Sequence, residues 1–165
     1  MSEIISDRYH YANPNVRPYV GLNHFSCASS ALHIAYRAFG LNYPEHEIIR
    51  DFRQDLREGV NWTKMMDHAE SLGFKADFFA ELDYESLLAP LYQIPYVLIV
   101  GWIAINHTVY KLHHCSPVRY ISQDKIALTN TGDHRLEKFE REEFIPLWHD
   151  YNHEHPFMTI RQETG

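Results

Sequence analysis

Residues 18–32 of the chain read PYVGLNHFSCASSAL, and this stretch decides how the rest of the sequence is interpreted. It places Cys27 directly after a turn and directly before a run of small residues. From Ala28 to Phe39, apolar side chains recur at three- and four-residue steps, which is typical of a helix with one buried face. Ser26 can cap that helix and Gly40 can end it. The stretch therefore predicts a helix with a cysteine at its start.

Cys27 is a candidate nucleophile because of this position. Main-chain N–H groups and the helix dipole favour a negative charge at a helix N-terminus. A lowered thiol pKa gives the thiolate, which is the reactive form of cysteine. The small residues that follow, beginning with Ala28, would leave room for a substrate. The alternative interpretation is a buried structural cysteine, which is a common place for this residue type.

The rest of the pattern predicts helices first and strands afterwards, which is an α+β layout. The continuous apolar run from Tyr96 to Trp102 is typical of a central strand that is buried on both faces. Pro117 indicates an edge or a bulged strand. The other expected elements are helices at 44–55, 61–72, 83–91 and 140–148, and strands at 74–80, 107–114, 117–122, 125–130 and 157–161.

Length and composition exclude several classes of protein. The chain has 165 residues, 45% of them apolar, which suits one domain with an extended arm at 1–17 and a tail or last strand at 150–165. A net charge of −7 disfavours nucleic-acid binding. The longest apolar run, 94–105, is too short to span a membrane. No secretory signal is visible, so we expect a cytoplasmic protein whose two cysteines remain thiols.

A cysteine nucleophile needs a base within hydrogen-bond reach, and that base needs a partner to orient it. His113 and His114 stand at the entrance to a predicted strand, and Asn130 follows His114 by 16 residues across one predicted hairpin. Two paired strands can bring those ends side by side. Because successive side chains of a strand point to opposite faces, only one of the two histidines can face Cys27. The sequence leaves that choice open.

A metal site is the rival interpretation of the histidines, of which there are 12. The candidate ligands are His113, His114 and Cys115 together with His149, His153 or His155. However, neither Cys-x-x-Cys nor His-Glu-x-x-His spacing is present. We therefore expect no metal and no other cofactor.

The stretch around Cys27 resembles the active-site opening of the C39 and C39-like peptidases, a group of papain-like cysteine peptidases. In that group a loop leads to a cysteine and small residues at a helix start. The order of the later elements is similar too, and the likeness covers roughly residues 18–150. It is carried by the segments 59–79, 87–100 and 114–131 and by Glu143, Phe144 and Trp148. The resemblance implies a papain-like α+β fold in which a helical half with a central helix is followed by an antiparallel sheet half.

The resemblance also implies roles for individual residues. Cys27 would be the nucleophile, His114 the general base and acid, and Asn130 the orienting residue at a position where relatives often carry Asp. Ala28 stands where the group usually has Gly. The group also has a Gln shortly before the cysteine as oxyanion donor, and here the nearest amide is Asn23. Asn23 and Ala28 are thus the candidate oxyanion and substrate-binding residues.

The function implied is that of a cysteine-dependent hydrolase or acyl transferase acting on a peptide amide or a thioester. Its partner would be a peptide or an acyl-carrying substrate, with no nucleic acid and no membrane. The chain is also similar to the N-terminal domain of acyltransferases of the butirosin-biosynthesis type. Two alternatives stay open, an inactive C39-like domain that binds peptides and a deamidase on the same scaffold. The oligomeric state is left open as well.

Overall fold

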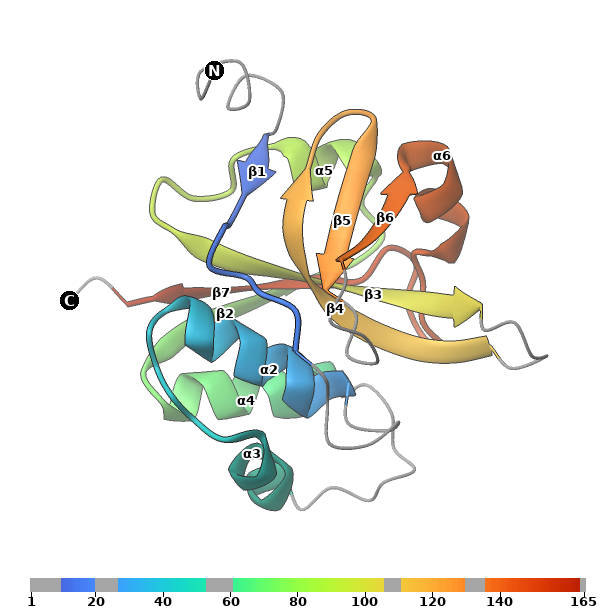
Figure 1. Ribbon diagram of the computed structural model, residues 1–165. Helices are drawn as coiled ribbons and strands as arrows, with labels where there is room; N and C mark the ends of the chain where they lie inside the picture. Colours follow the sequence, from blue (N-terminus) through green and yellow to red (C-terminus); the bar gives the residue numbers. More distant parts are fainter. Residues whose placement is uncertain (1–9, 20–26, 53–60, 106–110, 130–135, 164–165) are drawn as a thin grey trace.

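A computed structural model describes residues 10–19, 27–52, 61–105, 111–129 and 136–163 of the chain. Its centre is an antiparallel sheet in the order β2-β7-β3-β4-β5-β6, with β1 paired to β4. Helices cover both faces of this sheet (Figure 1). The predicted α+β fold, with a helical half followed by an antiparallel sheet half, is confirmed.

One face of the sheet is covered by α2 (Cys27–Ala38) and α4 (Trp62–Ser71), and α3 (Glu45–Phe52) packs against these two helices. Asn61 caps α4, where its side-chain oxygen accepts a hydrogen bond from the Lys64 N–H at 3.0 Å. Gly40 lies just beyond α2 with φ 85°, a conformation that favours glycine. The first three predicted helices are therefore confirmed within the described residues.

The opposite face carries α5 (Tyr84–Leu88), α6 (Arg141–Phe144) and a 3-10 turn, η1 (Ile145–Leu147). The predicted helix at 83–91 is too long, because α5 ends at Leu88. Ala89 has an extended backbone, which is expected of a residue that precedes proline, here Pro90. Asp83 precedes α5, but its side chain makes no cap hydrogen bond.

The strands follow the predicted order, with one correction. Within the described residues, the predicted strands 107–114 and 117–122 overlap a single strand, β4, which runs through Pro117. β6 was not predicted. The bounds are β1 (Tyr11–Ala12), β2 (Phe74–Phe79), β3 (Tyr96–Ile105), β4 (Lys111–Ile121), β5 (Lys125–Thr129), β6 (Leu136–Glu140) and β7 (Phe157–Gln162).

The hydrogen-bond register explains why β4 tolerates Pro117. Gly101 of β3 lies opposite Cys115 of β4, yet the Gly101 N–H donates to the Pro156 carbonyl. Gly101 and Cys115 are therefore a non-hydrogen-bonded pair, and so are the pairs two residues away. Pro117 lies opposite Ile99 in one of those pairs, so its missing N–H costs no ladder bond with β3. A bulge follows directly between Val118 and Tyr120.

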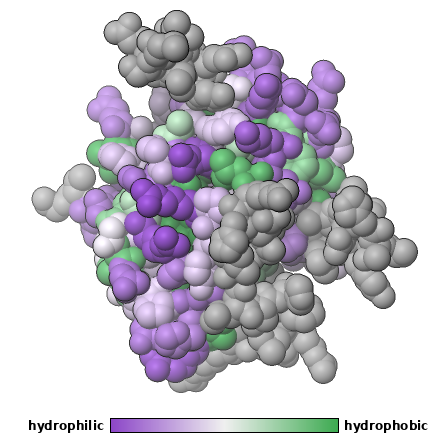
Figure 2. Space-filling model, viewed as in Figure 1, coloured by the Kyte–Doolittle hydropathy of each residue, from purple (hydrophilic) through white to green (hydrophobic). Residues whose placement is uncertain are grey.

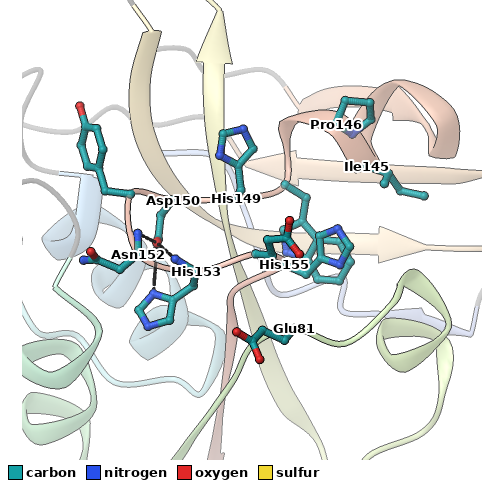
Figure 3. A pocket seen from close by; sticks show the side chains of 11 residues that line it. Glu81, Ile145, Pro146, His149, Asp150, Asn152, His153 and His155 are labelled. Carbon is teal, nitrogen blue, oxygen red and sulfur yellow. Dashed lines mark hydrogen bonds and ion pairs between the residues drawn. The ribbon is translucent and has the colours of Figure 1, made fainter.

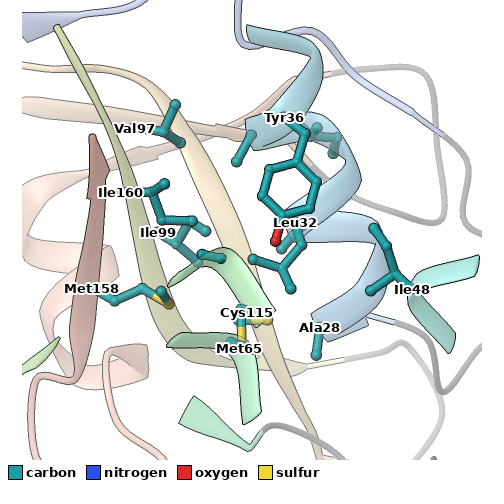
Figure 4. Packing of buried hydrophobic residues seen from close by; sticks show 14 of the residues in the cluster. Ala28, Leu32, Tyr36, Ile48, Met65, Val97, Ile99, Cys115, Met158 and Ile160 are labelled. Atoms are coloured by element: carbon teal, nitrogen blue, oxygen red, sulfur yellow. The ribbon is translucent and has the colours of Figure 1, made fainter. Parts of the chain in front are cut away.

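The sheet divides the core into two buried clusters, and β3 contributes to both. Val97 and Ile99 point toward α2 and α4, whereas Leu98, Val100 and Trp102 point toward α5 and α6. This alternation confirms that β3 is buried on both faces. Figure 4 shows the cluster on the α2 side.

The side of the molecule seen in Figure 2 is mainly hydrophilic, with hydrophobic residues in small separate groups. Among the described residues, the large hydrophobic side chains that are exposed are Leu41, Leu82 and Tyr151. None of the helices in the described ranges is both long and apolar enough to cross a membrane.

Gly101 allows β3 to lie close to α4, and its replacement by Ala is expected to destabilise the fold. A Cβ atom at Gly101 would lie 2.6 Å from Trp62 Cζ2 and 3.0 Å from Pro156 Cγ. Overpacking of this kind typically costs about 1–3 kcal/mol. Urea unfolding followed by circular dichroism should show a lower midpoint for Gly101→Ala than for the unmodified chain. An unchanged midpoint would show that Trp62 moves aside without cost.

Candidate active site

Cys27 is the first residue of α2, and 4% of its surface is exposed. The helix therefore begins at the candidate nucleophile, as the sequence pattern predicts. Its Sγ lies 3.9 Å from the carbonyl oxygen of His113 in β4. Main-chain N–H groups of a first helical turn have no partner within the helix, so they favour negative charge at this position.

The Cys27 sulfur lies at an edge of β4. Because Gly101 and Cys115 are a non-hydrogen-bonded pair, Cys115 directs its main-chain N–H and C=O away from β3. The same holds for His113, two residues earlier. Among the described residues, β5 pairs with β4 only from Val118 onward, so β5 does not occupy this part of the edge. The Cys115 N–H instead donates to the Cys27 sulfur.

Side chains from both faces of β4 reach the Cys27 sulfur. The His114 ring lies on the face that carries Trp102, with ring centroids 5.7 Å apart. Its imidazole is within hydrogen-bond reach of Cys27. Cys115 points to the other face, into the cluster formed with α2, and its thiol is hydrogen bonded to Cys27. The His114 imidazole and the Cys115 thiol therefore approach the Cys27 sulfur from opposite faces of β4.

These contacts favour a thiolate at Cys27. The hydrogen bond from the Cys115 thiol is the largest influence that holds the pKa of Cys27 well below its usual range. Burial acts in the opposite direction, and the nearby His114 imidazole lowers the pKa further. The pKa of Cys115 is raised well above its usual range by the hydrogen bond to Cys27 and by burial. The surroundings of the two sulfurs thus favour ionisation of Cys27 over ionisation of Cys115.

His113 lies on the other side of the strand, so the structure separates the two candidate bases. Its ring packs against Tyr151, with ring centroids 3.5 Å apart. Its Nδ1 is buried and has no hydrogen-bond partner among the described residues. Burial lowers the pKa of His113, although the nearby Asp150 carboxylate acts in the opposite direction. These surroundings favour a neutral ring, and we infer that His114 is the histidine that acts on Cys27.

A loop at 149–154 lies beside His113, because its Tyr151 contacts the His113 ring. Figure 3 shows the side chains of this loop around Asp150. Asp150 organises this loop, since one carboxylate oxygen accepts from the N–H groups of Asn152 and His153 at 2.8 and 2.7 Å. The other carboxylate oxygen accepts from Trp62 Nε1 of α4 at 2.8 Å. Partial burial opposes ionisation, but these hydrogen bonds prevail and lower the pKa of Asp150.

The same loop lines a polar pocket with a volume of about 570 Å³. Tyr151 at its rim is 85% exposed while its ring contacts His113. The pocket therefore lies next to the strand that carries the candidate base. Its lining residues include Glu81, Trp148, His149, Asp150, Tyr151 and His153.

The described residues do not assemble the rival metal site. Within these ranges, no group of three or more His, Cys, Asp or Glu residues is placed to hold an ion. His153 hydrogen-bonds to Asp150 at 3.1 Å. His155 stacks on Trp148, with centroids 4.3 Å apart, and its Nδ1 lies 2.6 Å from the Leu82 carbonyl oxygen.

The small residues that follow Cys27 take part in the packing of α2. Ala28, Ser29 and Ser30 are all buried. The Ser29 and Ser30 hydroxyls donate to the Glu45 carboxylate of α3, at 3.3 and 2.6 Å. Their small size therefore lets α3 pack closely against the start of α2, which fixes the helix that carries Cys27.

Two predicted site residues, Asn23 and Asn130, lie outside the described residues, so their roles stay predictions. Conversely, Cys115 was not predicted to contact Cys27, and its only predicted role was that of a candidate metal ligand. Its position two residues after His113 on a strand was the available signal. Residues 113 and 115 point to the same face of β4. This spacing indicates a contact between Cys115 and Cys27 only once β4 is known to run beside α2.

The fold is similar to that of C39 peptidase domains of known structure. The peptidase domain of Streptococcus ComA, a bifunctional ABC transporter involved in quorum sensing, has a TM-score of 0.69 at 14% identity, with 90% of this chain and 99% of that chain covered. A double glycine motif protease from an AMS/PCAT transporter, solved in complex with its leader peptide, has a TM-score of 0.71 at 13% identity, covering 94% and 98%. A C39-like peptidase from Bacillus anthracis has a TM-score of 0.67 at 12% identity, covering 92% and 97%.

The fold that the resemblance implied, the papain-like fold of the C39 group, is thereby confirmed. No protein-family model matches the chain, and no curated protein matches it in sequence. At these identities the likeness extends to the fold alone, and the chemistry has to be argued from the residues of this chain.

Proposed function

We propose that the chain is a cysteine-dependent hydrolase or acyl transferase that acts on a peptide amide or a thioester. The observation that supports the proposal best is the position of Cys27 at the start of α2, where the Cys115 thiol and the His114 imidazole lower the pKa of its thiol. A nucleophile with a lowered pKa beside a base is the arrangement that covalent catalysis needs. The C39 peptidase fold is consistent with this chemistry.

The mechanism follows from the positions of these groups. The Cys27 thiolate attacks the substrate carbonyl, and the negative charge that develops on the oxygen is stabilised by main-chain N–H groups at the start of α2. His114 acts as the general acid that donates a proton to the leaving amine or thiol. Water or an amine then releases the acyl group from Cys27. In the proposed triad, Asn130 orients His114, and Asn23 adds a hydrogen bond to the oxyanion.

A peptide is the substrate class we propose. One protein with this fold is a double glycine motif protease that has been solved in complex with the leader peptide. In this chain, the pocket beside His113 has a polar lining and an exposed aromatic ring, Tyr151, at its rim. Such a surface offers stacking and hydrogen bonds to an extended chain.

The test uses peptides with a double glycine motif, and matching peptide thioesters, with mass spectrometry of both the peptide and the protein. We expect a cleaved peptide and an acyl adduct whose mass maps to Cys27. The same reaction with Cys27→Ala controls for contaminating peptidases. Peptide binding without cleavage or adduct would contradict the proposal and favour the inactive peptide-binding domain. Conversion of Gln to Glu in the peptide without backbone cleavage would favour the deamidase.

A further inference from the structure

We propose that Cys27 and Cys115 form an oxidation site, at which peroxide converts the two thiols into a disulfide and withdraws the nucleophile reversibly. The proposed function uses Cys27 alone and assigns no chemistry to Cys115. These are the two cysteines of the chain, and neither is in a disulfide in this structure.

The two cysteines lie close together in the fold. Cys27 begins α2 and Cys115 lies in β4, in the same buried cluster. The Cys115 side chain points toward the first turn of α2, where Figure 4 shows it beside Ala28 and Met65. Cys27 Sγ lies 3.9 Å from the carbonyl oxygen of His113, two residues before Cys115 on β4, and the Cys115 thiol is the group that influences Cys27 most, so the two sulfurs lie close together.

The order of the reaction follows from the different states of the two sulfurs. Cys27 favours the thiolate, which is the form that peroxide oxidises. Cys115 favours the thiol because burial and the thiolate of Cys27 raise its pKa. Cys27 is therefore oxidised first, and Cys115 acts as the resolving cysteine.

The chemistry balances with hydrogen peroxide as the oxidant. The Cys27 thiolate attacks one oxygen of the O–O bond, which forms Cys27 sulfenic acid and releases hydroxide. The proton that Cys27 lost on ionising converts this hydroxide to water. The Cys115 sulfur then attacks the Cys27 sulfur, forming the S–S bond as hydroxide leaves, and the Cys115 proton converts that hydroxide to water. Overall, two thiols and one hydrogen peroxide give one disulfide and two waters. A dithiol reductant reverses the change by thiol–disulfide exchange.

Disulfide formation at this site would protect Cys27 from irreversible oxidation and would also inactivate it reversibly. Without a resolving thiol, a sulfenic acid is oxidised further to sulfinic acid, which is generally irreversible. The consequence for catalysis rests on the proposed function, whereas the disulfide itself does not. The experiment therefore follows oxidation and uses no substrate, so that failure of peptide cleavage and failure of the disulfide remain separate results.

The experiment treats the full chain with hydrogen peroxide, blocks remaining thiols with iodoacetamide under denaturing conditions, and maps tryptic peptides without reduction. We expect a linked pair of peptides that contain Cys27 and Cys115, and loss of both alkylation sites. Treatment with dithiothreitol should restore both. Sulfinic acid at Cys27 with Cys115 still alkylated would overturn the proposal, and so would two thiols that resist peroxide concentrations sufficient to oxidise glutathione.

Two variants sharpen the result. In Cys115→Ser, Cys27 should accumulate sulfinic acid that dithiothreitol does not restore. In Cys27→Ala, Cys115 should remain an alkylatable thiol, because the thiolate that starts the reaction is absent. Oxidation of Cys115 in that variant at the rate seen in the unmodified chain would contradict the proposed order. If the buried Cys115→Ser substitution prevents folding, the peptide map of the unmodified chain still decides the question.

Discussion

Replacing Cys27 by Ala is expected to abolish turnover of the peptide or thioester substrate and to remove the acyl adduct. The proposed mechanism depends on the Cys27 sulfur for the covalent intermediate, so the loss should be on the order of 10⁴- to 10⁶-fold in kcat. Ala is a good helix former, so the circular dichroism spectrum should remain that of the unmodified chain. Substrate turnover and protein mass measured together are the readout.

Cys115→Ala provides the matched control for that prediction, since it removes the other buried thiol by the same change. This variant should still form the acyl adduct, although its nucleophile loses a hydrogen bond. Cleavage by Cys27→Ala at the rate of the unmodified chain would rule out Cys27 as the nucleophile. An adduct on Cys115 in that variant would show that Cys115, and not Cys27, is the nucleophile.

Replacing His114 by Ala should lower kcat/KM by about 10²- to 10⁴-fold, which is the usual contribution of a general acid and base. Its imidazole lowers the pKa of Cys27, so its removal should raise that pKa toward the ordinary thiol value. The rate at neutral pH should therefore fall more than the rate at alkaline pH. Rate profiles against pH for the variant and the unmodified chain measure both effects.

The control for this second prediction is His113→Ala, one residue earlier on the same strand. His113 packs against Tyr151, and the side chains that lower the pKa of Cys27 are Cys115 and His114, so removal of His113 should leave most of that lowering in place. The titratable groups that face Cys27 most closely are His114 and Cys115. If His113→Ala raises the pKa of Cys27 and His114→Ala does not, the assignment of the two histidines is reversed.

The helix that begins at Cys27 could be predicted because its periodicity and its Gly40 stop are local features. The separation of His113 from His114 could not be predicted, because the pairing of β4 with β3 fixes which side chain faces which layer. For the same reason, Pro117 misled the strand prediction. A proline breaks a strand only where its N–H is needed, and Pro117 opposes Ile99 in a non-hydrogen-bonded pair.

The surroundings of Cys27 depended on contacts between distant segments. Glu45 lies in a different helix from Ser29 and Ser30. Only the packing of α3 on α2 shows that the two serine hydroxyls donate hydrogen bonds to this carboxylate. Cys115 is 88 positions from Cys27 in the sequence, and the edge of β4 brings the two sulfurs together. Spacing in the sequence indicates neither contact, because each depends on how helices and strands pack.

The rate of Cys27 alkylation by iodoacetamide against pH, followed by mass spectrometry with Cys115 as the internal comparison, tests the central claim most directly. Because the folded protein lowers the pKa of Cys27, its thiolate should persist as the pH falls below the ordinary thiol value of about 8.5. We predict that Cys27 reacts at neutral pH close to its maximal rate, whereas Cys115 reacts slowly until the solution is strongly alkaline. A Cys27 that is inert, or that reacts no faster than Cys115, would contradict the account.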